Sequence, residues 1–302
     1  MLDLREMLKA GIHFGHKTAR WCPKMRPFIW GAKNKVHLID VSKTAILLEK
    51  AGSYIKAVAA NGGTLLWIGT KKPAQAAIQK IADNLHMPFV INRWVGGTLS
   101  NYDQVKKAIT RLLHLRDVVK KGGSYYKKKE IVMITKEIAR LEKNVGGIIE
   151  LEYPPAAIII VDAKKEHAAV KEASTLKIPI IALVDTNTDP EGVSLIIPAN
   201  DDSPRSINFV LEYLAAQAQE GKKLYLEKRD RERQEQLDLK KQQRAKLDIE
   251  TKVQHKDLKQ EAPLPPKIPT NAAVKTAPSS TGNAVNPAVK VDEPAVTKEH
   301  KE

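Results

Sequence analysis

Short apolar runs alternate with amphipathic segments through the middle of the chain, and this alternation predicts its core. Five runs are apolar on both faces, as expected of parallel strands covered on both sides: 64–69, 89–91, 157–162, 180–185 and 194–197. Helical spacing follows over 73–85 and 166–176, and a further helix begins near Ser203. Strands separated by helices predict a three-layer α/β/α domain with a parallel sheet, doubly wound or flavodoxin-like.

An insertion interrupts this domain between the second and third predicted strands. Apolar residues recur there at alternating steps of three and four in two arms, Val105, Ala108, Leu112, Leu115 and Val119, then Ile131, Ile134, Ile138, Leu141 and Val145. Gly122, Gly123 and Ser124 lie between the arms. Two seams joined by a glycine turn predict an antiparallel coiled-coil hairpin over 101–147, which we expect to project from the domain rather than fold onto it.

The last third of the chain changes from an amphipathic to a charged and then to a proline-rich pattern. An apolar stripe is formed by Ile207, Val210, Leu211 and Leu214. The segment after Gly221 is charged nearly all round, and 262–302 has repeated prolines and no apolar period, which predicts a disordered tail. The predicted organisation is a globular α/β domain, a hairpin, a charged helical extension and a tail, over 1–100 with 148–226, 101–147, 227–261 and 262–302.

Positive charge is concentrated in the first half of the chain. The formal net charge is +15, yet residues 1–150 carry 27 Lys and Arg against 11 Asp and Glu, a net charge of +16. Residues 151–221 carry 5 against 11, a net charge of −6. Such polarity favours one face for a polyanion and another that avoids it, although a well-solvated basic protein would show a similar total.

Cysteine content and hydropathy exclude several classes of protein. The single cysteine, Cys22, permits no internal disulfide and no zinc cluster with a second thiol. No stretch approaches the roughly 18 apolar residues of a membrane-spanning helix. The first residues resemble neither a secretory signal nor a transit peptide. We therefore expect a cytoplasmic protein without a membrane partner.

The motifs that mark nucleotide-dependent and hydrolytic α/β enzymes are missing from the sequence. No two glycines stand two positions apart, so the dinucleotide fingerprint is absent, and no phosphate-binding P-loop follows the first predicted strand. The Gly-x-Ser-x-Gly elbow and the His-Glu-x-x-His motif are absent as well. The turn Thr70-Lys71-Lys72 suits a phosphate at a helix N-terminus, which could belong to RNA. We expect no enzymatic activity, no cofactor and no small-molecule substrate.

Basic and aromatic residues alternate in the N-terminal segment, a composition typical of loops that contact phosphates and stack on exposed bases. Pro23 and Pro27 interrupt regular helix there. The outer faces of the predicted hairpin are also basic. The candidate RNA-binding residues are Lys17, Arg20, Trp21, Lys24, Arg26, Lys33, Lys35, Thr70, Lys71, Lys72, Arg93, Trp94, Lys106, Arg111, Lys127 and Lys128.

Aspartates cluster at or just beyond the predicted carboxyl ends of the last three strands, where open α/β sheets usually bind ligands. These are Asp162, Asp185, Asp189, Asp201 and Asp202. Ordinary turn and cap chemistry is the favoured interpretation, because 185–192 is rich in turn formers and 201–203 can cap a helix. One alternative is a structural Mg²⁺ or Zn²⁺ ion bound by His16, Asp185 and Asp189. The main functional alternative is a phosphate- or Mg²⁺-dependent enzyme that uses Asp162, Asp185 and Asp189.

Several long motifs resemble those of the bacterial ribosomal protein S2 family. The segments LKAGIHFGH at 8–16 and PKMRPFI at 23–29 resemble the opening of that family. NRWVGGTLSN at 92–101 is similar to its signature ahead of the helical insertion. The likeness continues through its second signature and two further motifs, at 155–179, 182–187 and 197–202, and it covers about residues 2–226.

This resemblance implies a flavodoxin-like core with a coiled-coil arm and no catalytic activity. It also implies binding to 16S ribosomal RNA at the back of the small subunit, contacts with neighbouring small-subunit proteins, and recruitment of the large first small-subunit protein that captures messenger RNA. Residues beyond about 227 exceed the usual length of the family. We expect the protein in the cytoplasm on the ribosome, and a free RNA-binding regulator is a third interpretation.

Overall fold

The computed structural model describes residues 2–122 and 126–260, with side chains described for 2–121 and 126–241. By its internal contacts the chain divides into two units, Met1–Lys241 and Gln242–Glu302. The fold below is that of the first unit. Most of the predicted glycine turn of the hairpin and all of the predicted tail over 262–302 lie outside the described residues.

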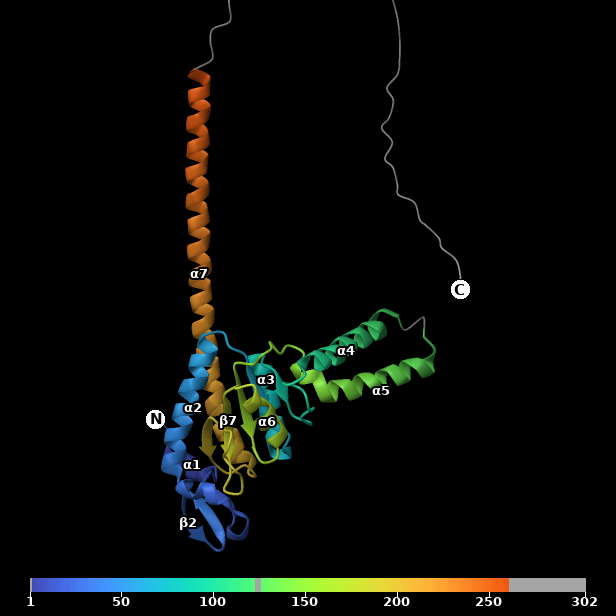
Figure 1. Ribbon diagram of the computed structural model, residues 1–302, viewed down its shortest axis with the longest axis vertical. Coiled ribbons are helices and arrows are strands. Elements are labelled where there is room, and N and C mark those ends of the chain that lie inside the picture. Colours follow the sequence, from blue (N-terminus) through green and yellow to red (C-terminus); the bar gives the residue numbers. More distant parts are fainter. Residues whose placement is uncertain (1, 123–125, 261–302) are drawn as a thin grey trace, which may run out of the picture. The chain divides into compact units, whose positions relative to one another are not determined.

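A five-stranded parallel sheet forms the centre of the domain (Figure 1). Its strands are β4 (Leu65–Ile68), β5 (Phe89–Val90), β6 (Ala157–Val161), β7 (Ile180–Val184) and β8 (Leu195–Pro198). They lie in the order β5-β4-β6-β7-β8, and each neighbouring pair is parallel. This is the strand order of flavodoxin-like sheets, with the reversal between β4 and β6. Every residue of β4, β6 and β7 is buried, which confirms the predicted strands and fold class.

Helices cover both faces of this sheet. Against one face pack α1 (Leu4–Lys9), α2 (Val41–Ala60), α3 (Lys72–Leu85) and the first turns of α7 (Pro204–Gln260). The predicted apolar stripe of α7 faces this core, because Ile207, Val210, Leu211 and Leu214 are all buried. Against the other face pack α6 (His167–Thr175) and the base of the hairpin. No described helix is both long enough and apolar enough to cross a bilayer.

The insertion is a pair of antiparallel helices, α4 (Tyr102–Gly122) and α5 (Lys128–Val145), followed by the short helix η3 (Gly146–Ile148). Its base belongs to the domain core, because Val105, Ile109 and Leu112 are buried together with β4 and β6 residues. Beyond Leu112 in α4, and before Val145 in α5, no described residue is buried. The distal arms are therefore covered only by each other, as in a projecting hairpin. The predicted seam was wrong near the tip, where Val119 is 39% exposed.

An N-terminal three-stranded antiparallel sheet was not predicted from the sequence. It comprises β1 (Phe14–Lys17), β2 (Ile29–Lys33) and β3 (Val36–Ile39), in the order β1-β3-β2. The predicted loop between β1 and β2 contains two short 3₁₀ helices, η1 (Thr18–Arg20) and η2 (Pro23–Phe28). Asn34 and Lys35 both have positive φ, as a tight hairpin turn between β2 and β3 requires.

Candidate nucleic-acid interface

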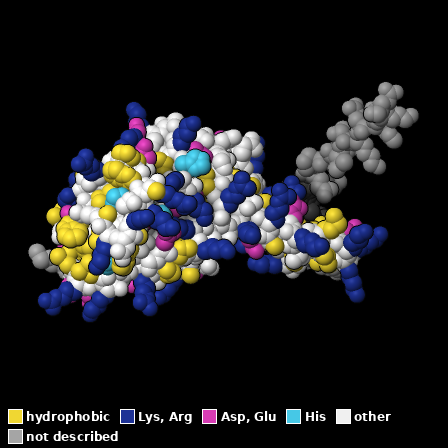
Figure 2. All heavy atoms as spheres, turned by 90° about the horizontal axis from the view of Figure 1, so that it is seen from below, with side chains coloured by type: hydrophobic (Ala, Val, Ile, Leu, Met, Phe, Trp, Pro, Cys, Tyr) yellow, Lys and Arg dark blue, Asp and Glu magenta, His cyan; other side chains and the backbone are white. Residues whose placement is uncertain are grey.

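The N-terminal sheet and its loops present basic side chains to solvent. Lys17 on β1, Arg20 in η1 and Arg26 in η2 are exposed, and so are Lys33 and Lys35 at the turn between β2 and β3. Figure 2 shows Lys and Arg side chains distributed over one face of the molecule, with fewer acidic ones among them. The residues that anchor this segment are apolar, since Met7 and Ile12 are buried in one core cluster and Met25 in the other. The predicted cations therefore lie on a segment whose apolar residues pack into both core clusters.

Lys24 differs from its basic neighbours because it is paired within the protein. Its Nζ lies 2.9 Å from Asp189 Oδ2 and also contacts Glu191 Oε2. These hydrogen bonds raise the pKa of Lys24 and lower the pKa of Asp189. The contact ties the η2 segment to the loop between β7 and β8. Asp189 is therefore engaged by Lys24, and the prediction that it lies beside His16 and Asp185 was wrong.

The turn after β4 is also engaged within the protein. Thr70 is buried, and its hydroxyl and backbone N–H donate to Glu166 Oε1. Lys71 Nζ lies 2.7 Å from Asp201 Oδ1, 2.6 Å from Asp202 Oδ1 and 3.5 Å from Asp162 Oδ2. Of the three residues predicted to hold a phosphate here, only Lys72 is exposed. Thr70 and Lys71 thus connect the turn after β4 to Glu166 and to the aspartates at the sheet edge.

Trp94 and Arg93, predicted together, lie in different environments. Trp94 is 7% exposed, and its Nε1 donates to Glu172 Oε1 at 3.0 Å. A buried indole with a satisfied donor is not available for stacking on a base, so this part of the prediction is corrected. Arg93 is exposed, and the side chain of the preceding residue, Asn92, donates to the backbone carbonyl of Lys143 on α5.

The hairpin presents the remaining predicted cations. Lys106, Arg111, Lys127 and Lys128 are exposed on α4, on α5 and just before α5. Arg111 is paired across the two helices with Glu137, at 2.7 Å between Nη2 and Oε1. The pair leaves the guanidinium largely exposed, so Arg111 can contact a further anion at the hairpin surface.

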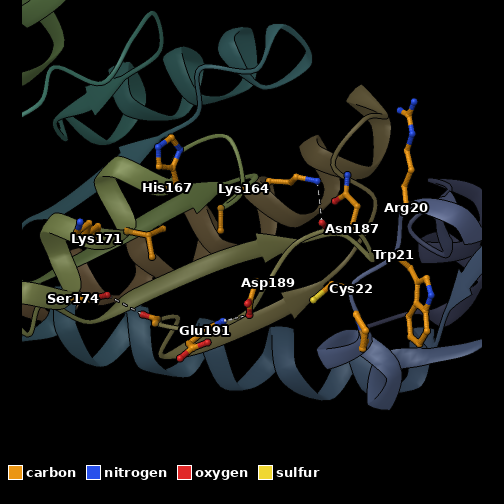
Figure 3. Close-up of a pocket in the computed structure, with 14 residues that line it drawn as sticks. Arg20, Trp21, Cys22, Lys164, His167, Lys171, Ser174, Asn187, Asp189 and Glu191 are labelled. Carbon is orange, nitrogen blue, oxygen red and sulfur yellow. Dashed lines mark hydrogen bonds between the residues drawn. The ribbon is translucent and has the colours of Figure 1, made fainter.

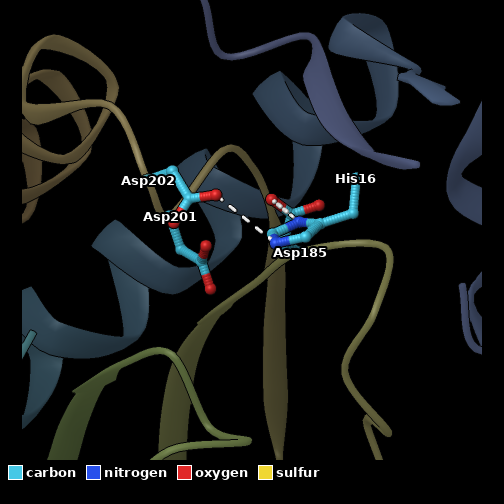
Figure 4. Close-up of side chains that lie close together, drawn as sticks. All are labelled: His16, Asp185, Asp201 and Asp202. Carbon is cyan, nitrogen blue, oxygen red and sulfur yellow. Dashed lines mark ion pairs between the residues drawn. The ribbon is translucent and has the colours of Figure 1, made fainter. Parts of the chain in front are cut away.

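A cluster of His16 with three aspartates lies at the carboxyl edge of the parallel sheet (Figure 4). His16 Nδ1 is 2.9 Å from Asp185 Oδ2, and His16 Nε2 is 3.3 Å from Asp202 Oδ2. Both contacts are ion pairs when His16 is protonated. One ligand atom from each of His16, Asp185, Asp201 and Asp202 lies within 4.8 Å of the others. This donor set differs from the predicted one by the loss of Asp189 and the gain of Asp201 and Asp202.

Negative charge in this cluster is incompletely compensated. Burial, together with the nearby charges of Asp162 and Asp185, raises the pKa of Asp201 to about 7 despite its contact with Lys71. Asp201 Oδ2 is buried without a hydrogen-bond partner among the described residues. The contact with Asp185 raises the pKa of His16. A divalent cation would supply the missing charge, and one imidazole with three carboxylates suits Zn²⁺ or a similar ion.

The aspartates converge because they follow the ends of neighbouring parallel strands. Their distance from each predicted strand end is visible in the sequence. Asp185 and Asp201 closely follow β7 and β8, which are adjacent and parallel, whereas Asp189 lies in the loop four residues further on. Residues 201–203, predicted to cap a helix, directly precede α7. Asn200 Oδ1 accepts from the backbone N–H groups of Asp202 and Ser203, which leaves both aspartate side chains for the cluster.

Comparison with known proteins assigns the chain to a family. A family model described as "Ribosomal protein S2" matches residues 7–221. Two relatives, each named "Small ribosomal subunit protein uS2", come from Corynebacterium glutamicum strains R and ATCC 13032. Each is 43% identical over 225 residues, which are 74% of this chain and 85% or 83% of the relative. Family model and relatives agree with the motifs, the parallel sheet and the helical insertion, and the chain therefore belongs to the ribosomal protein S2 family.

Proposed function

We propose that this protein is a non-enzymatic constituent of the small ribosomal subunit that binds 16S ribosomal RNA. Membership of a ribosomal protein family supports a structural role and association with ribosomal RNA and proteins. Two surfaces would hold RNA phosphates, the N-terminal sheet with its loops and the outer face of the hairpin. The protein would accordingly act on the ribosome.

The observation that carries the proposal is the set of exposed cations on these two surfaces. Arg26, Lys33 and Lys128 are exposed, and none of them forms an ion pair with a described residue. Cations without protein partners are available to phosphate oxygens, and RNA binding by such contacts releases counterions. Lys24 and Lys71, in contrast, are already paired with carboxylates.

Subunit incorporation tests this proposal. We expect Arg26→Glu/Lys33→Glu/Lys128→Glu to lose co-sedimentation with small subunits, because each change replaces attraction to a phosphate by repulsion. The matched control, Lys50→Glu/Lys80→Glu/Lys177→Glu, alters three exposed lysines outside both surfaces and should co-sediment normally. Normal incorporation of the first variant would show that the RNA surface lies elsewhere.

Docking of the large first small-subunit protein is a finer part of the proposal. Its support is a group of exposed large apolar side chains near the N-terminus, namely Leu4, Leu8, Phe14 and Trp30. Exposed aromatic residues are frequent anchors in protein interfaces. We expect Trp30→Ser to weaken binding of that protein to purified subunits while leaving the variant's own incorporation unchanged. Retained binding would remove Trp30 from the interface.

We also propose a structural cation at His16, Asp185, Asp201 and Asp202. It is supported by the convergence of four ligand atoms and by the buried Asp201 Oδ2 without a described partner. Bound there, a Zn²⁺ ion would join β1 to the ends of β7 and β8 and would neutralise the acidic edge. Its role would be structural, since these residues are not paired with a nucleophile in any motif of the sequence.

A further inference from the structure

A cavity with apolar and charged lining residues lies between the N-terminal loop and α6. It has a volume of about 760 Å³, within the range of roughly 300–1,000 Å³ typical of small-molecule sites. Arg20 and Trp21 line it from the N-terminal loop, and Lys164, His167 and Lys171 line it from α6 and the preceding turn (Figure 3). The cavity thus joins residues from two distant parts of the sequence.

The charges of its lining favour an anion. Two acidic residues line the cavity, Asp189 and Glu191, and both are paired with Lys24. No ion pair within the described part of the chain involves Arg20, Lys164 or Lys171. Lys164 Nζ donates instead to the backbone carbonyl of Asn187 at 3.3 Å, which holds the ammonium at the cavity. The single charge of Lys24 offsets one of these two carboxylates, and the three cations Arg20, Lys164 and Lys171 outnumber the one that remains.

Its apolar lining favours a flat aromatic group. Trp21 is 36% exposed, and its ring lies 5.3 Å, between centroids, from the tilted ring of His37. Pro23 and Val170 add apolar surface. Asn187 contributes an amide, whose Oδ1 accepts from the Thr188 hydroxyl and whose Nδ2 can donate to a base edge.

We propose that this cavity binds one unstacked nucleotide of single-stranded RNA, an inference that rests on the proposed function and adds a site to it. The base would stack on Trp21 with its edge at Asn187, and the phosphate would contact Lys164, while Arg20 and Lys171 lie at opposite ends of the cavity and add positive charge there (Figure 3). Aromatic platforms beside cations are the usual means of holding single-stranded bases. An acidic peptide would satisfy the cations but would make no use of the platform and amide together.

Fluorescence of a base analogue tests the site in the full-length protein. The probe is a single-stranded RNA hexanucleotide with a central 2-aminopurine, and the comparison is the same base paired in an RNA hairpin. We expect the single strand to bind with a change in 2-aminopurine emission. Trp21→Ala should weaken its binding at least about fivefold, since one stacked base contributes about 1–3 kcal/mol. Lys164→Gln/Lys171→Gln should also weaken it.

Matched controls separate the cavity from the general RNA surface. Trp30→Ala removes an exposed tryptophan that does not line the cavity, and Lys50→Gln/Lys80→Gln removes two lysines elsewhere, so both should bind like wild type. Equal weakening by Trp21→Ala and Trp30→Ala, or equal binding of the paired base, would overturn the cavity proposal. So would preferential binding of a short Glu- and Phe-containing peptide. Co-sedimentation of the wild-type protein with small subunits tests the proposed function independently of these outcomes.

Discussion

The carboxylate of Glu172 on α6 is enclosed by donors from the loop that precedes the hairpin. Trp94 Nε1 and the Gly97 N–H donate to one oxygen at 3.0 and 2.9 Å, and the N–H groups of Leu99 and Ser100 donate to the other at 3.0 and 3.1 Å. Burial alone would raise the pKa of Glu172, but these hydrogen bonds outweigh it and lower the pKa. One side chain therefore fixes a loop that lies more than 70 residues away in sequence.

Glu172→Gln should destabilise the protein in a pH-dependent manner. The amide loses the charge and places donors against donors, so we expect a loss of about 1.5–3 kcal/mol at neutral pH. Because the folded pKa lies below the unfolded value of about 4.3, the contribution of Glu172 is complete above that value and is lost as the pH falls through the folded pKa. The difference in melting temperature between wild type and variant should hence shrink below about pH 4. The exposed Glu150→Gln is the control, and a difference independent of pH would contradict this account.

Addition of a divalent ion tests the cluster of His16 with three aspartates. Zn²⁺ at about 100 times its dissociation constant should stabilise the wild-type protein by about 2.7 kcal/mol and raise its melting temperature by roughly 5–10 °C. Asp201→Asn and His16→Ala should abolish the increase. Asp189→Asn should retain it, since Asp189 lies outside the cluster. The same scan with Mg²⁺ identifies the preferred ion, and no increase with either would exclude the site.

At the scale of elements, the base of the hairpin is part of the domain while its distal arms are supported only by each other. Leu112 is fully buried between the hairpin and the sheet, whereas the next residue, Leu113, is 44% exposed. Ile109 is buried as well, although it falls outside the predicted seam. The helical face at the base is set by the domain core and not by the partner arm alone.

Adjacent leucines provide a test of this division. Leu112→Ala should cost about 2–5 kcal/mol of unfolding free energy, because it leaves a cavity in the core. Leu113→Ala removes the same atoms from an exposed position and should change stability by less than about 0.5 kcal/mol. Urea denaturation of both variants measures the difference. Similar values for the two leucines would indicate that the hairpin base is not part of the cooperative core.

Some elements could be predicted from the sequence and others could not. Strands buried on both faces, such as β6 and β7, leave continuous apolar runs and were predicted. The helix α2 was missed although its buried residues Thr44, Leu48, Ala51, Ile55 and Ala59 recur at steps of three and four. The N-terminal strands are short and largely not buried, so no alternation marks them. The inward positions of Thr70 and Trp94 depend on Glu166 and Glu172, partners far away in sequence that no local pattern identifies.

At the scale of the whole molecule, the net charge indicates an anion-binding surface less well than the positions of the cations that have no carboxylate partner. Lys71 and Lys24 contribute to the basic total but face carboxylates, whereas Arg26, Lys33 and Lys128 face solvent. Arg26, Lys33 and Lys128 lie on the N-terminal sheet with its loops and on the hairpin. A polyanion would therefore meet the protein at these two surfaces, and the acidic sheet edge would be left for a cation.

Salt dependence measures how many of these cations contact phosphates. Arg26→Gln/Lys33→Gln/Lys128→Gln should reduce the slope of the logarithm of RNA affinity against the logarithm of salt concentration by about 2–3, since each lost phosphate contact removes about 0.7–0.9. Lys24→Gln should reduce it by much less, because Lys24 is neutralised within the protein. Slopes are obtained from titrations of labelled ribosomal RNA fragments. Equal changes per residue in the two variants would contradict the distinction.

The two edges of the parallel sheet determine whether a second copy of the chain could add a strand to it. Exposed strand edges invite pairing with a second chain and promote aggregation. At one edge β5 has only two residues, and the backbone of Gly147 lies so close to the Phe89 carbonyl that an added Cβ would clash with it. At the other edge β8 ends in Pro198, which has no N–H and whose carbonyl accepts from the buried Thr44 hydroxyl at 2.6 Å. The folded chain thus offers little template for strand addition by a second copy, which favours a single folded molecule in solution.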